Sequence, residues 1–475
     1  MAREIDFENS YVLRPAYTLK TRTGEWRIPP GLRKTLPFYL NKPWARLGKP
    51  ILLFEYMAKN VGPISHYMLF GNHVVFLNDP TAIREVLVNQ ADKFIRERTI
   101  QRLKILLGEG LLTSDDPTHK RSRRIAAPAF HRARINAYAD EMVRSAVHAR
   151  DRWHDGEVVD MNASMMTLSL EVVARTLFDT EVDDDIREIN HQSNAIMAIY
   201  NYLVAFPNAE MFLKWHLPGL GRFVRARKKL DKVVRRIIAD RKVWNAAHPE
   251  QADRKDLLSM LLLARDEDGS ELDDDQLRDE VLTIFLAGYE TTANALSWTW
   301  YLLATNPEAQ ETMFAEIDSV LNGRMPTLED YPQLKYTQMV FAEGMRLYPP
   351  AWAMGRKSTE PIEVGGYRLP PGTHWFISQY IVQRDERFYP DPLRFDPLRH
   401  TEEEKAKRDK FEYFPFGGGP RQCIGEGFAW LEGVLLLATV AQKWRLAWID
   451  GQPVEVEEKI TLRPKYPIRV TLHSR

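Results

Sequence analysis

The chain has 475 residues, of which 44% are hydrophobic, and its 65 lysines and arginines balance its 65 aspartates and glutamates. This apolar content is ample for a large core and excludes a disordered polypeptide. The zero net charge gives no indication of nucleic acid as a partner. One cysteine excludes an internal disulfide, a cysteine-rich zinc site and a protein-held iron–sulfur cluster, and it agrees with a reducing compartment.

The sequence contains no Ser/Gly-rich linker, repeat or low-complexity tract, so we expect residues 1–475 to form a single large unit. The N-terminal stretch MAREIDFENSYVLRPAY alternates charged with apolar residues and lacks the continuous apolar core of a signal peptide or membrane anchor. We therefore expect a soluble, cytoplasmic protein without a transmembrane anchor.

Two regions have the pattern of short strands. Residues 64–77 predict a pair of strands that turn at Gly71 and Asn72, followed by a helix that opens near Asp79 and Pro80. Residues 362–378 predict further strands, with turns at Gly365-Gly366 and at Pro370-Pro371-Gly372. The remaining pattern is mostly helical, so the fold class is mainly α with small β-sheet regions. The expected parts are β-rich segments at about 50–90 and 360–380, a helical core at about 115–350, and a cysteine loop with its following helix at 411–445.

Residues 196–220, IMAIYNYLVAFPNAEMFLKWHLPGL, are apolar and aromatic, and Pro207 and Pro218 interrupt them. Such a segment is typical of a lid over an apolar pocket, and equally of ordinary helix packing.

The longest predicted helix starts after Asp273-Asp274-Asp275 and continues without proline to about Thr305. Its second half is apolar enough to suggest a membrane span, but Glu290 and its polar neighbours lie in the middle. We therefore predict the core helix of a large soluble protein.

The only cysteine, Cys423, lies in Phe416-Gly417-Gly418-Gly419-Pro420-Arg421-Gln422-Cys423-Ile424-Gly425, just before an apolar helix. Glycines let the backbone approach a flat ligand, and a sulfur at a helix N-terminus is favoured as the thiolate. A single cysteine is also a common buried hydrophobic residue. A phosphate-binding loop is a further reading, but the Lys-Ser/Thr ending of that motif is missing.

The segment FGGGPRQCIG matches every fixed position of F-x-x-G-x-R-x-C-x-G, and the chain on this basis resembles the cytochrome P-450 family. The resemblance extends through most of the chain. It implies a single haem domain in which Cys423 is the axial ligand of the iron of haem b, while Phe416, Gly417, Arg421 and Gly425 contribute to the haem-binding loop. It also implies O2 as co-substrate.

Ala287-Gly288-Tyr289-Glu290-Thr291-Thr292 resembles the oxygen-activation motif of the family. The resemblance implies that Thr291 hydrogen-bonds to the oxygen, that Glu290 relays protons and that Ala287 leaves clearance over the haem. Splitting O2 consumes protons in an otherwise dry pocket, which requires a hydroxyl and a carboxyl there. Gly288 in mid-helix permits a local opening of the hydrogen-bond ladder. In isolation, a surface carboxylate beside a helix-facing threonine would explain the same residues.

Glu343 and Arg346 have the i,i+3 spacing that places both side chains on one helix face, as in many surface ion pairs. The resemblance instead places this pair in the interior and joins it to Arg399 of the segment FDPLR. Leu398 and His400 depart from the Glu and Phe usual in that segment, which leaves the surroundings of the triad open.

The basic run Asp116–Arg124 is usually a solvated helix face, but it resembles the helix that meets the haem propionates. Two buried propionates need cationic or hydrogen-bonding partners. The nominated partners are His119, Arg123, Arg356 and Arg421, with Arg98 as a further candidate.

The chain has no dinucleotide fingerprint and no flavin domain, so electrons must come from a separate protein. We expect an acidic ferredoxin or flavodoxin-type partner to dock by electrostatic steering on the basic residues Lys120–Arg124, Arg132, Arg134 and Lys405–Lys410.

The expected substrate is a hydrophobic small molecule such as a fatty acid, terpenoid or steroid. By order along the chain, its contacts should come from residues 98–112, 197–220, the central helix and 351–354. The expected function is O2-dependent hydroxylation. The alternative is a haem-thiolate protein that does not use O2, either a peroxide-driven isomerase or peroxygenase, or a haem-based sensor.

Overall fold

The structure is a computed structural model, and it describes residues 11–34, 49–69, 71–179, 188, 191, 192, 196, 220–251, 256–265, 269 and 271–475. The chain divides into two compact units. Unit 1 comprises residues 1–101, 351–393 and 407–423, and unit 2 comprises residues 102–350, 394–406 and 424–475. Neither unit is a continuous stretch of chain, and the single-unit organisation expected above stays a prediction.

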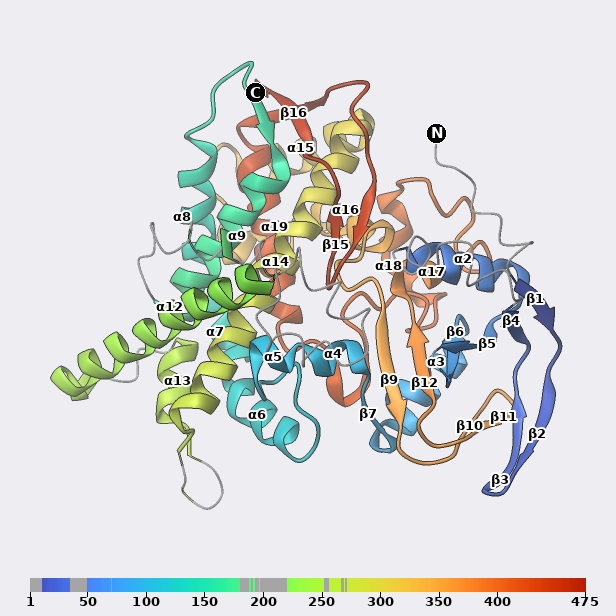
Figure 1. Ribbon diagram of the computed structural model, residues 1–475. Helices are drawn as coiled ribbons and strands as arrows, with labels where there is room; N and C mark the ends of the chain where they lie inside the picture. Colours follow the sequence, from blue (N-terminus) through green and yellow to red (C-terminus); the bar gives the residue numbers. More distant parts are fainter. Residues whose placement is uncertain are drawn as a thin grey trace. The chain divides into compact units, whose positions relative to one another are not determined.

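Unit 1 contains a seven-stranded sheet (Figure 1). In spatial order its strands are β1 (Tyr11–Arg14), β4 (Gly31–Lys34), β5 (Ile64–Leu69), β6 (Asn72–Leu77), β12 (His374–Ile377), β9 (Met354–Ser358) and β7 (Phe94–Arg96). The predicted strand pair at 64–77 is confirmed: β5 and β6 are antiparallel, and Gly71 adopts a φ of 80° in their connection.

A second sheet of unit 1 contains β10 (Ile362–Val364), β11 (Tyr367–Leu369), β3 (Gly24–Ile28) and β2 (Tyr17–Thr21). The predicted turn between β10 and β11 is present, with Gly365 and Gly366 at positive φ. Trp26 of β3 and Trp375 of β12 belong to one buried hydrophobic core that joins the two sheets.

The helices of unit 1 are short. They are α2 (Pro50–Asn60), α3 (Pro80–Arg84), η2 (Glu85–Asn89), η3 (Ala91–Lys93), α4 (Arg98–Arg102, which ends at the unit boundary), α17 (Gln379–Val382) and η8 (Gly419–Arg421). α3 begins as predicted, because the Asp79 side chain accepts a hydrogen bond from the Ala82 amide at 2.8 Å and Pro80 occupies the first turn.

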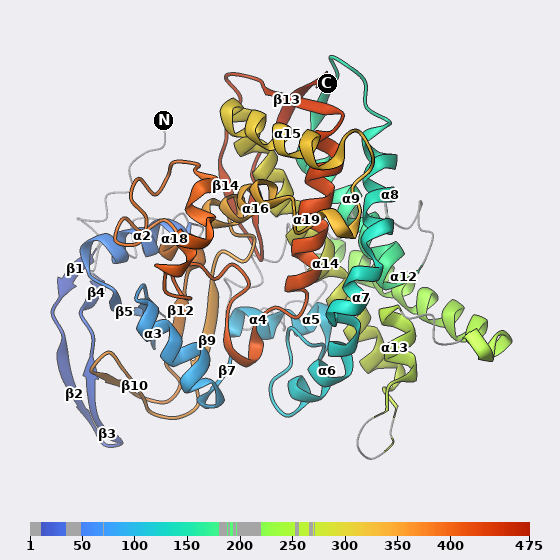
Figure 2. The same ribbon diagram turned by 180° about the vertical axis from the view of Figure 1, so that it is seen from behind.

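Unit 2 is mainly helical, and α14 (Asp274–Thr305) packs against α9, α16 and α19 in its interior (Figures 1 and 2). Its longer helices are α8 (Ala139–Arg150), α9 (Met161–Leu177), α12 (Leu220–Ala247), α15 (Pro307–Leu321), α16 (Lys335–Leu347) and α19 (Glu426–Ala441). The shorter ones are α5 (Lys104–Leu107), α6 (Thr118–Ala126), η4 (Ala127–Phe130), α7 (Arg132–Ala137), η5 (Pro249–Gln251), α13 (Leu257–Leu263), η6 (Leu328–Asp330), η7 (Pro397–His400) and α18 (Glu402–Ala406).

The predicted core helix is α14. The Asp273 side chain caps it in a reciprocal arrangement with Gln276, and Trp298 and Trp300 in its second half are fully buried. Within the described ranges, no helix combines the length and the apolar character that a membrane span requires.

Two small sheets complete unit 2. One pairs β13 (Trp444–Trp448) with β16 (Arg469–Ser474) and β16 with β8 (Val158–Asp160), and the other pairs β14 (Val456–Glu458) with β15 (Leu462–Pro464). Neither these sheets nor the strands at 11–34 were predicted from the sequence.

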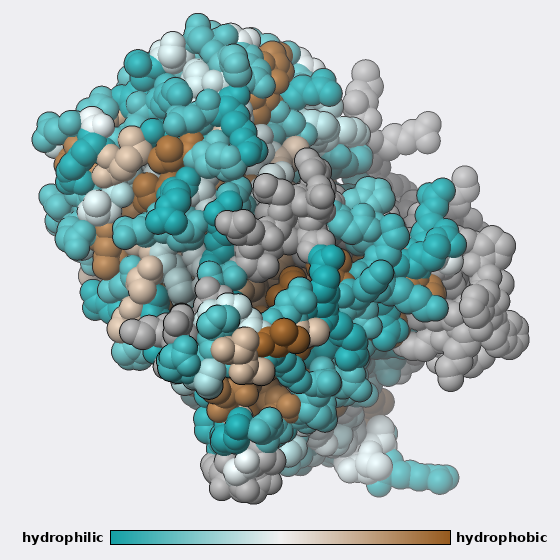
Figure 3. All heavy atoms as spheres, turned by 90° about the vertical axis from the view of Figure 1, so that its left-hand side faces the viewer, coloured by the Kyte–Doolittle hydropathy of each residue, from teal (hydrophilic) through white to brown (hydrophobic). Residues whose placement is uncertain are grey.

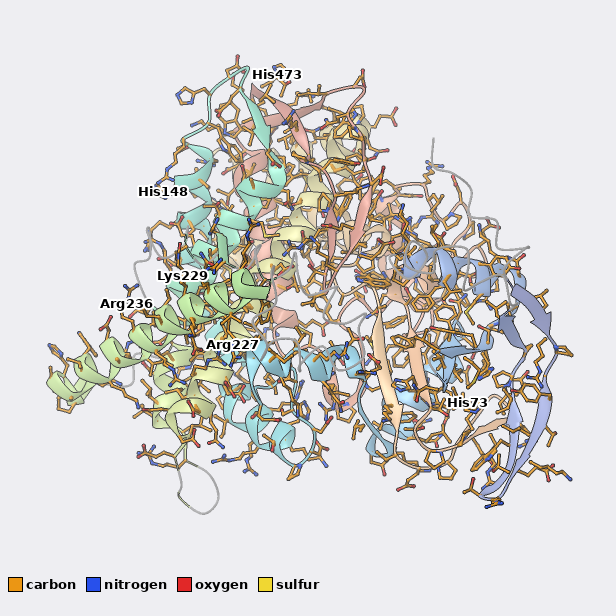
Figure 4. All side chains as sticks on the ribbon, in the orientation of Figure 1. His73, His148, Arg227, Lys229, Arg236 and His473 are labelled. Carbon is orange, nitrogen blue, oxygen red and sulfur yellow. The ribbon has the colours of Figure 1, made fainter. Side chains whose placement is uncertain are left out.

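The outer side of α12 carries exposed lysines and arginines, and Figure 4 shows Arg227, Lys229 and Arg236 along this helix. The space-filling view of the side on which α12 lies is largely hydrophilic (Figure 3). Opposite this face, Phe223, Leu230 and Val234 are buried, as expected of an amphipathic surface helix.

Candidate functional site

The cysteine loop of unit 1 has a conformation that only glycine accommodates. Gly417 and Gly419 adopt φ angles of 74° and 71°. A Cβ at Gly419 would lie 1.8 Å from the carbonyl oxygen of Leu87, so no side chain fits there. The Cys423 amide donates a hydrogen bond of 3.0 Å to the Phe416 carbonyl, which closes the loop.

The Cys423 side chain is exposed within this closed loop. Free cysteines are among the most buried residue types, so an accessible sulfur on a tightly packed glycine loop indicates a ligand-binding role. Gly425 occupies the N-cap of α19, and Cys423 lies two residues before this cap along the chain. The glycines leave room for a flat group to approach the loop backbone, and the cysteine sulfur can act as a metal ligand. Both features fit the haem group expected from the sequence.

Two arginines of unit 1 lie opposite each other on neighbouring strands. Arg356 of β9 pairs in register with Arg96 of β7, and both are only 8% exposed. Buried guanidinium groups require anionic or acceptor partners, which the propionates of a haem would provide. Arg421 is half-buried in the cysteine loop, whereas Arg98 is exposed at the start of α4.

The structure thus places Arg96, rather than the nominated Arg98, beside Arg356. The burial of Arg96 could have been predicted from the alternation of side chains along a strand, because Arg96 lies on the same face of β7 as buried Phe94. The three-residue length of β7 left that alternation too short to be recognised.

In unit 2, the nominated His119 and Arg123 both lie on α6. His119 is buried, and its Nδ1 is 3.2 Å from Asp116 Oδ1, so the imidazole is oriented by a carboxylate. Arg123 lies one turn further along and is half-buried. The i,i+4 spacing places both side chains on one face of the helix.

The segment Ala287–Thr292 interrupts the burial of α14. Between Leu277 and Trp300, the accessible positions are Asp279, Ala287, Gly288 and Thr291, and the other residues are buried. The hydroxyl of Thr291 donates to the Ala287 carbonyl at 2.8 Å. Such bonds to the carbonyl four residues earlier weaken the helix ladder locally, so this turn combines an accessible face with a hydroxyl on it.

The Glu290 side chain does not share the accessible face of α14 with Thr291. It is buried, and its Oε1 accepts hydrogen bonds from Arg463 Nη2 at 2.7 Å, from Arg463 Nε at 3.0 Å and from the Thr461 hydroxyl. The carboxylate is therefore part of a buried ion pair that connects α14 to β15. The structure does not bring it onto the accessible face that carries Thr291.

Glu343 forms the centre of a buried polar cluster. Arg346 binds it through two hydrogen bonds of 2.7 Å, and Arg399 Nε lies 3.6 Å from its Oε1. His400 Nε2 is 2.9 Å from Oε2, and the Asp396 amide donates to Oε1 at 3.0 Å. Burial by itself raises the pKa of Glu343, but hydrogen bonds from Arg346 and His400 outweigh it and hold the pKa below its usual range. His400 was not predicted from the sequence to belong to this cluster.

Residues 197–219, proposed to cover the substrate, lie outside the described residues. Most of the basic residues proposed to receive an electron donor are exposed, namely Lys120, Arg124, Arg132, Lys405, Lys407 and Lys410. Arg121 instead donates to Gln276 at 3.3 Å and is half-buried.

Comparison with known proteins gives one consistent result. Residues 29–472 match the model of the family described as cytochrome P-450. Cyclooctatin synthase from Streptomyces melanosporofaciens is 39% identical over 81% of this chain and 83% of its own length. The cyclooctat-9-en-7-ol 5-monooxygenase of the same organism is 36% identical over 78% and 80%.

Pentalenene oxygenase from Streptomyces avermitilis is 34% identical over 89% of this chain and 90% of its own length. These relatives and the family match confirm the resemblance stated from the cysteine segment, and with it the mainly helical fold with small sheets. The chain belongs to the cytochrome P-450 family, whose cofactor is haem, and it is a monooxygenase.

Proposed function

We propose that this protein inserts one oxygen atom from O2 into a C–H bond of a cyclic terpenoid, with haem b bound through the sulfur of Cys423. Two relatives, a cyclooctat-9-en-7-ol 5-monooxygenase and a pentalenene oxygenase, favour terpenoids over fatty acids and steroids as the substrate class. The observation that carries the proposal is the exposed Cys423 thiol on a loop in which Gly419 admits no side chain.

The reaction converts substrate, O2, two protons and two electrons into an alcohol and water. The haem, when bound, supplies the iron at which O2 is activated. Arg96, Arg356 and Arg421 in unit 1, and His119 and Arg123 in unit 2, would hold its propionates through charge-assisted hydrogen bonds. The Thr291 hydroxyl donates to the Ala287 carbonyl, and its oxygen can in addition accept a hydrogen bond from a group that carries the consumed protons.

Isotope-labelled O2 tests the reaction. The purified protein, a reductase system and a panel of cyclic terpenes should give alcohols that contain one labelled oxygen atom, and fatty acids and steroids of similar size should give less product. Product formed with peroxide but never with O2 and a reductant would replace this proposal by the peroxide-driven alternative.

The electron donor is proposed to be an acidic ferredoxin or flavodoxin-type protein that docks on the basic residues of α6 and α7. Arg124→Glu and Arg132→Glu change exposed side chains, whereas Arg121 contacts Gln276 and is a poorer choice. Each reversal should slow electron transfer at low salt and reduce its salt dependence. Lys232→Glu on the exposed side of α12 is the control and should have no effect. Equal rates in all three variants would contradict this docking site.

A further inference from the structure

A cluster of aromatic side chains in unit 2 has no part in the mechanism above. Trp298 and Tyr301 lie one turn apart on α14, Tyr348 caps the C-terminus of α16, and Trp448 ends β13. α14 packs against both α16 and β13. Three elements thus bring their rings together beside the C-terminal half of α14.

The rings contact one another in an order that runs from the interior toward the surface. Trp298 stacks on Tyr348, with ring centroids 4.1 Å apart and planes 7° apart. Tyr301 stands edge-on to both rings, at 5.9 Å from Trp298 and 6.2 Å from Tyr348, and edge-on to Trp448 at 5.1 Å. Trp298 is 0% exposed, whereas the other three side chains are half-buried. Tyr301 is therefore the junction between the inner pair and Trp448.

The residue types in this cluster favour a role besides packing. All four rings belong to tryptophan or tyrosine, the aromatic side chains that readily lose one electron. Other ring pairs of unit 2, such as Phe178 with Phe285 and Phe341 with Trp430, contain phenylalanine, which resists oxidation. Phenylalanine would supply similar ring contacts. An unbroken set of oxidisable rings from the interior to the surface is suited to electron transfer.

The polar groups around the cluster determine what happens to protons when an electron leaves. The Trp298 indole N–H donates to the Leu462 carbonyl at 3.2 Å, and a neutral carbonyl is too weak a base to remove this proton. Oxidised Trp298 therefore keeps its N–H and carries a positive charge. Burial, with a smaller contribution from Tyr348, raises the pKa of Tyr301. The Tyr301 phenol is thus protonated at neutral pH, and on oxidation it gives its proton to solvent at its half-exposed edge.

The inner end of the cluster lies on the same face of α14 as Thr291. Seven residues separate Thr291 from Trp298, which is close to two full turns, so their axial separation is about 10 Å at 1.5 Å per residue. Thr291 belongs to the accessible turn at which O2 is proposed to react. The fully buried Trp298 is therefore the member of the cluster nearest to this turn along α14, and half-buried Trp448 is the outer end.

We propose that the cluster carries electrons from solution to the haem when the activated haem has not reacted with substrate, and thereby protects the protein from self-oxidation. The haem takes one electron from Trp298. Tyr301 reduces Trp298 and releases its phenol proton, and Trp448 reduces Tyr301, which regains a proton. A small thiol in solution then reduces Trp448. Two such passages convert two thiols and the activated oxygen atom into one disulfide and one water molecule. The inference rests on the proposed binding of haem through Cys423.

Electron paramagnetic resonance tests the path without product formation. The haem-loaded, substrate-free protein is mixed with peroxide and rapidly frozen. The wild type should show a tyrosyl radical, Tyr301→Phe should lose it, and Trp448→Phe should retain it for longer because the donor to Tyr301 is missing. Tyr331→Phe is the matched control and should keep the wild-type signal. Tyr331 is half-buried in unit 2, burial likewise raises its pKa, and it belongs to none of these ring pairs.

The lifetime of the haem tests the protection. With peroxide and no substrate, the haem absorbance should decay faster in Tyr301→Phe and Trp448→Phe than in the wild type. A small thiol should slow the decay in the wild type and in Tyr331→Phe, but not in the other two variants. The initial rate of terpene hydroxylation should be the same in all four proteins, because the cluster acts only when substrate has not reacted.

The variants are compared once the spectrum of the reduced, carbon monoxide-bound form has shown equal haem ligation. A tyrosyl signal and a decay rate in Tyr301→Phe equal to those of the wild type would overturn the electron path and leave the monooxygenase proposal standing. A wild type that forms no aromatic radical would also overturn the path. A wild type that makes no labelled terpene alcohol, but whose radical is lost in Tyr301→Phe, would instead overturn the proposed function and support the path.

Discussion

Single residues decide whether the cysteine loop can form. Gly419 combines a φ of 71° with a position at which a Cβ would meet the Leu87 carbonyl. The sequence indicated that the glycines of this loop serve a close backbone approach. It could not indicate which backbone is approached, because Leu87 lies more than 300 positions earlier in the chain.

Gly419→Ala should therefore destabilise unit 1 strongly. The left-handed conformation costs an alanine about 1–2 kcal/mol, and the clash with Leu87 adds to it. Gly372→Ala is the matched control, since Gly372 has a φ of 82° and no atom near its Cβ position. Urea denaturation should show a larger loss for Gly419→Ala, together with a lower haem content. Equal losses in the two variants would mean that the contact with Leu87 does not matter.

Glu432 should make stability depend on pH. Its pKa is about 8 in the folded protein, against an ordinary value of 4.5 for a solvated glutamate, so the folded state binds the extra proton between these values. The free energy of unfolding of the wild type, relative to Glu432→Gln, should therefore fall as the pH rises through this interval. The slope from one proton is at most about 1.4 kcal/mol per pH unit. Parallel stability curves for the two proteins would show that Glu432 is not protonated in the fold.

At the scale of elements, α16 and η7 are held together by the Glu343 cluster. The i,i+3 spacing of Glu343 and Arg346 is visible in the sequence, but only the family resemblance predicted that both side chains are buried. His400 could not be assigned in advance because its hydrogen bond to Glu343 depends on how η7 packs, 57 positions away along the chain. Leu398, the other departure from the usual segment, is 57% exposed.

His400→Phe, which restores the residue usual in the family, should lower the free energy of unfolding by about 1–3 kcal/mol, because Glu343 loses a buried hydrogen-bond partner. Leu398→Glu makes the second usual replacement at an exposed site and should change stability by no more than about 0.5 kcal/mol. Thermal and urea unfolding measure both. A stable His400→Phe variant would show that Phe packing compensates for the lost hydrogen bond.

The elements that the sequence predicted well are those with strong local signals. α14 has an acidic cap and a long run without proline, and β5 and β6 flank a glycine turn. The strands β2 and β3 at the start of the chain and β14 and β15 near its end are short. They pair in local hairpins, β2 with β3 and β14 with β15, but strands of three to five residues are too short for an alternating pattern to be recognised. Arg463 was missed as the partner of Glu290 because the two residues are 173 positions apart in the chain.

At the scale of the whole molecule, the residues proposed to form the site are dispersed along the chain. Cys423 and Arg356 belong to unit 1, whereas Thr291 and His119 belong to unit 2. The family match from residue 29 to residue 472 includes all of them. The central claim is that Cys423 supplies the sulfur ligand of the haem iron.

The most direct test is the absorbance spectrum of the reduced, carbon monoxide-bound protein. The wild type should show the Soret band of a thiolate-ligated haem, and Cys423→Ala should lose it. Gly372→Ala is the control for an alanine substitution outside the cysteine loop, and its Soret band should match that of the wild type. A thiolate-type band that persists in Cys423→Ala would contradict the assignment of Cys423 as the haem ligand.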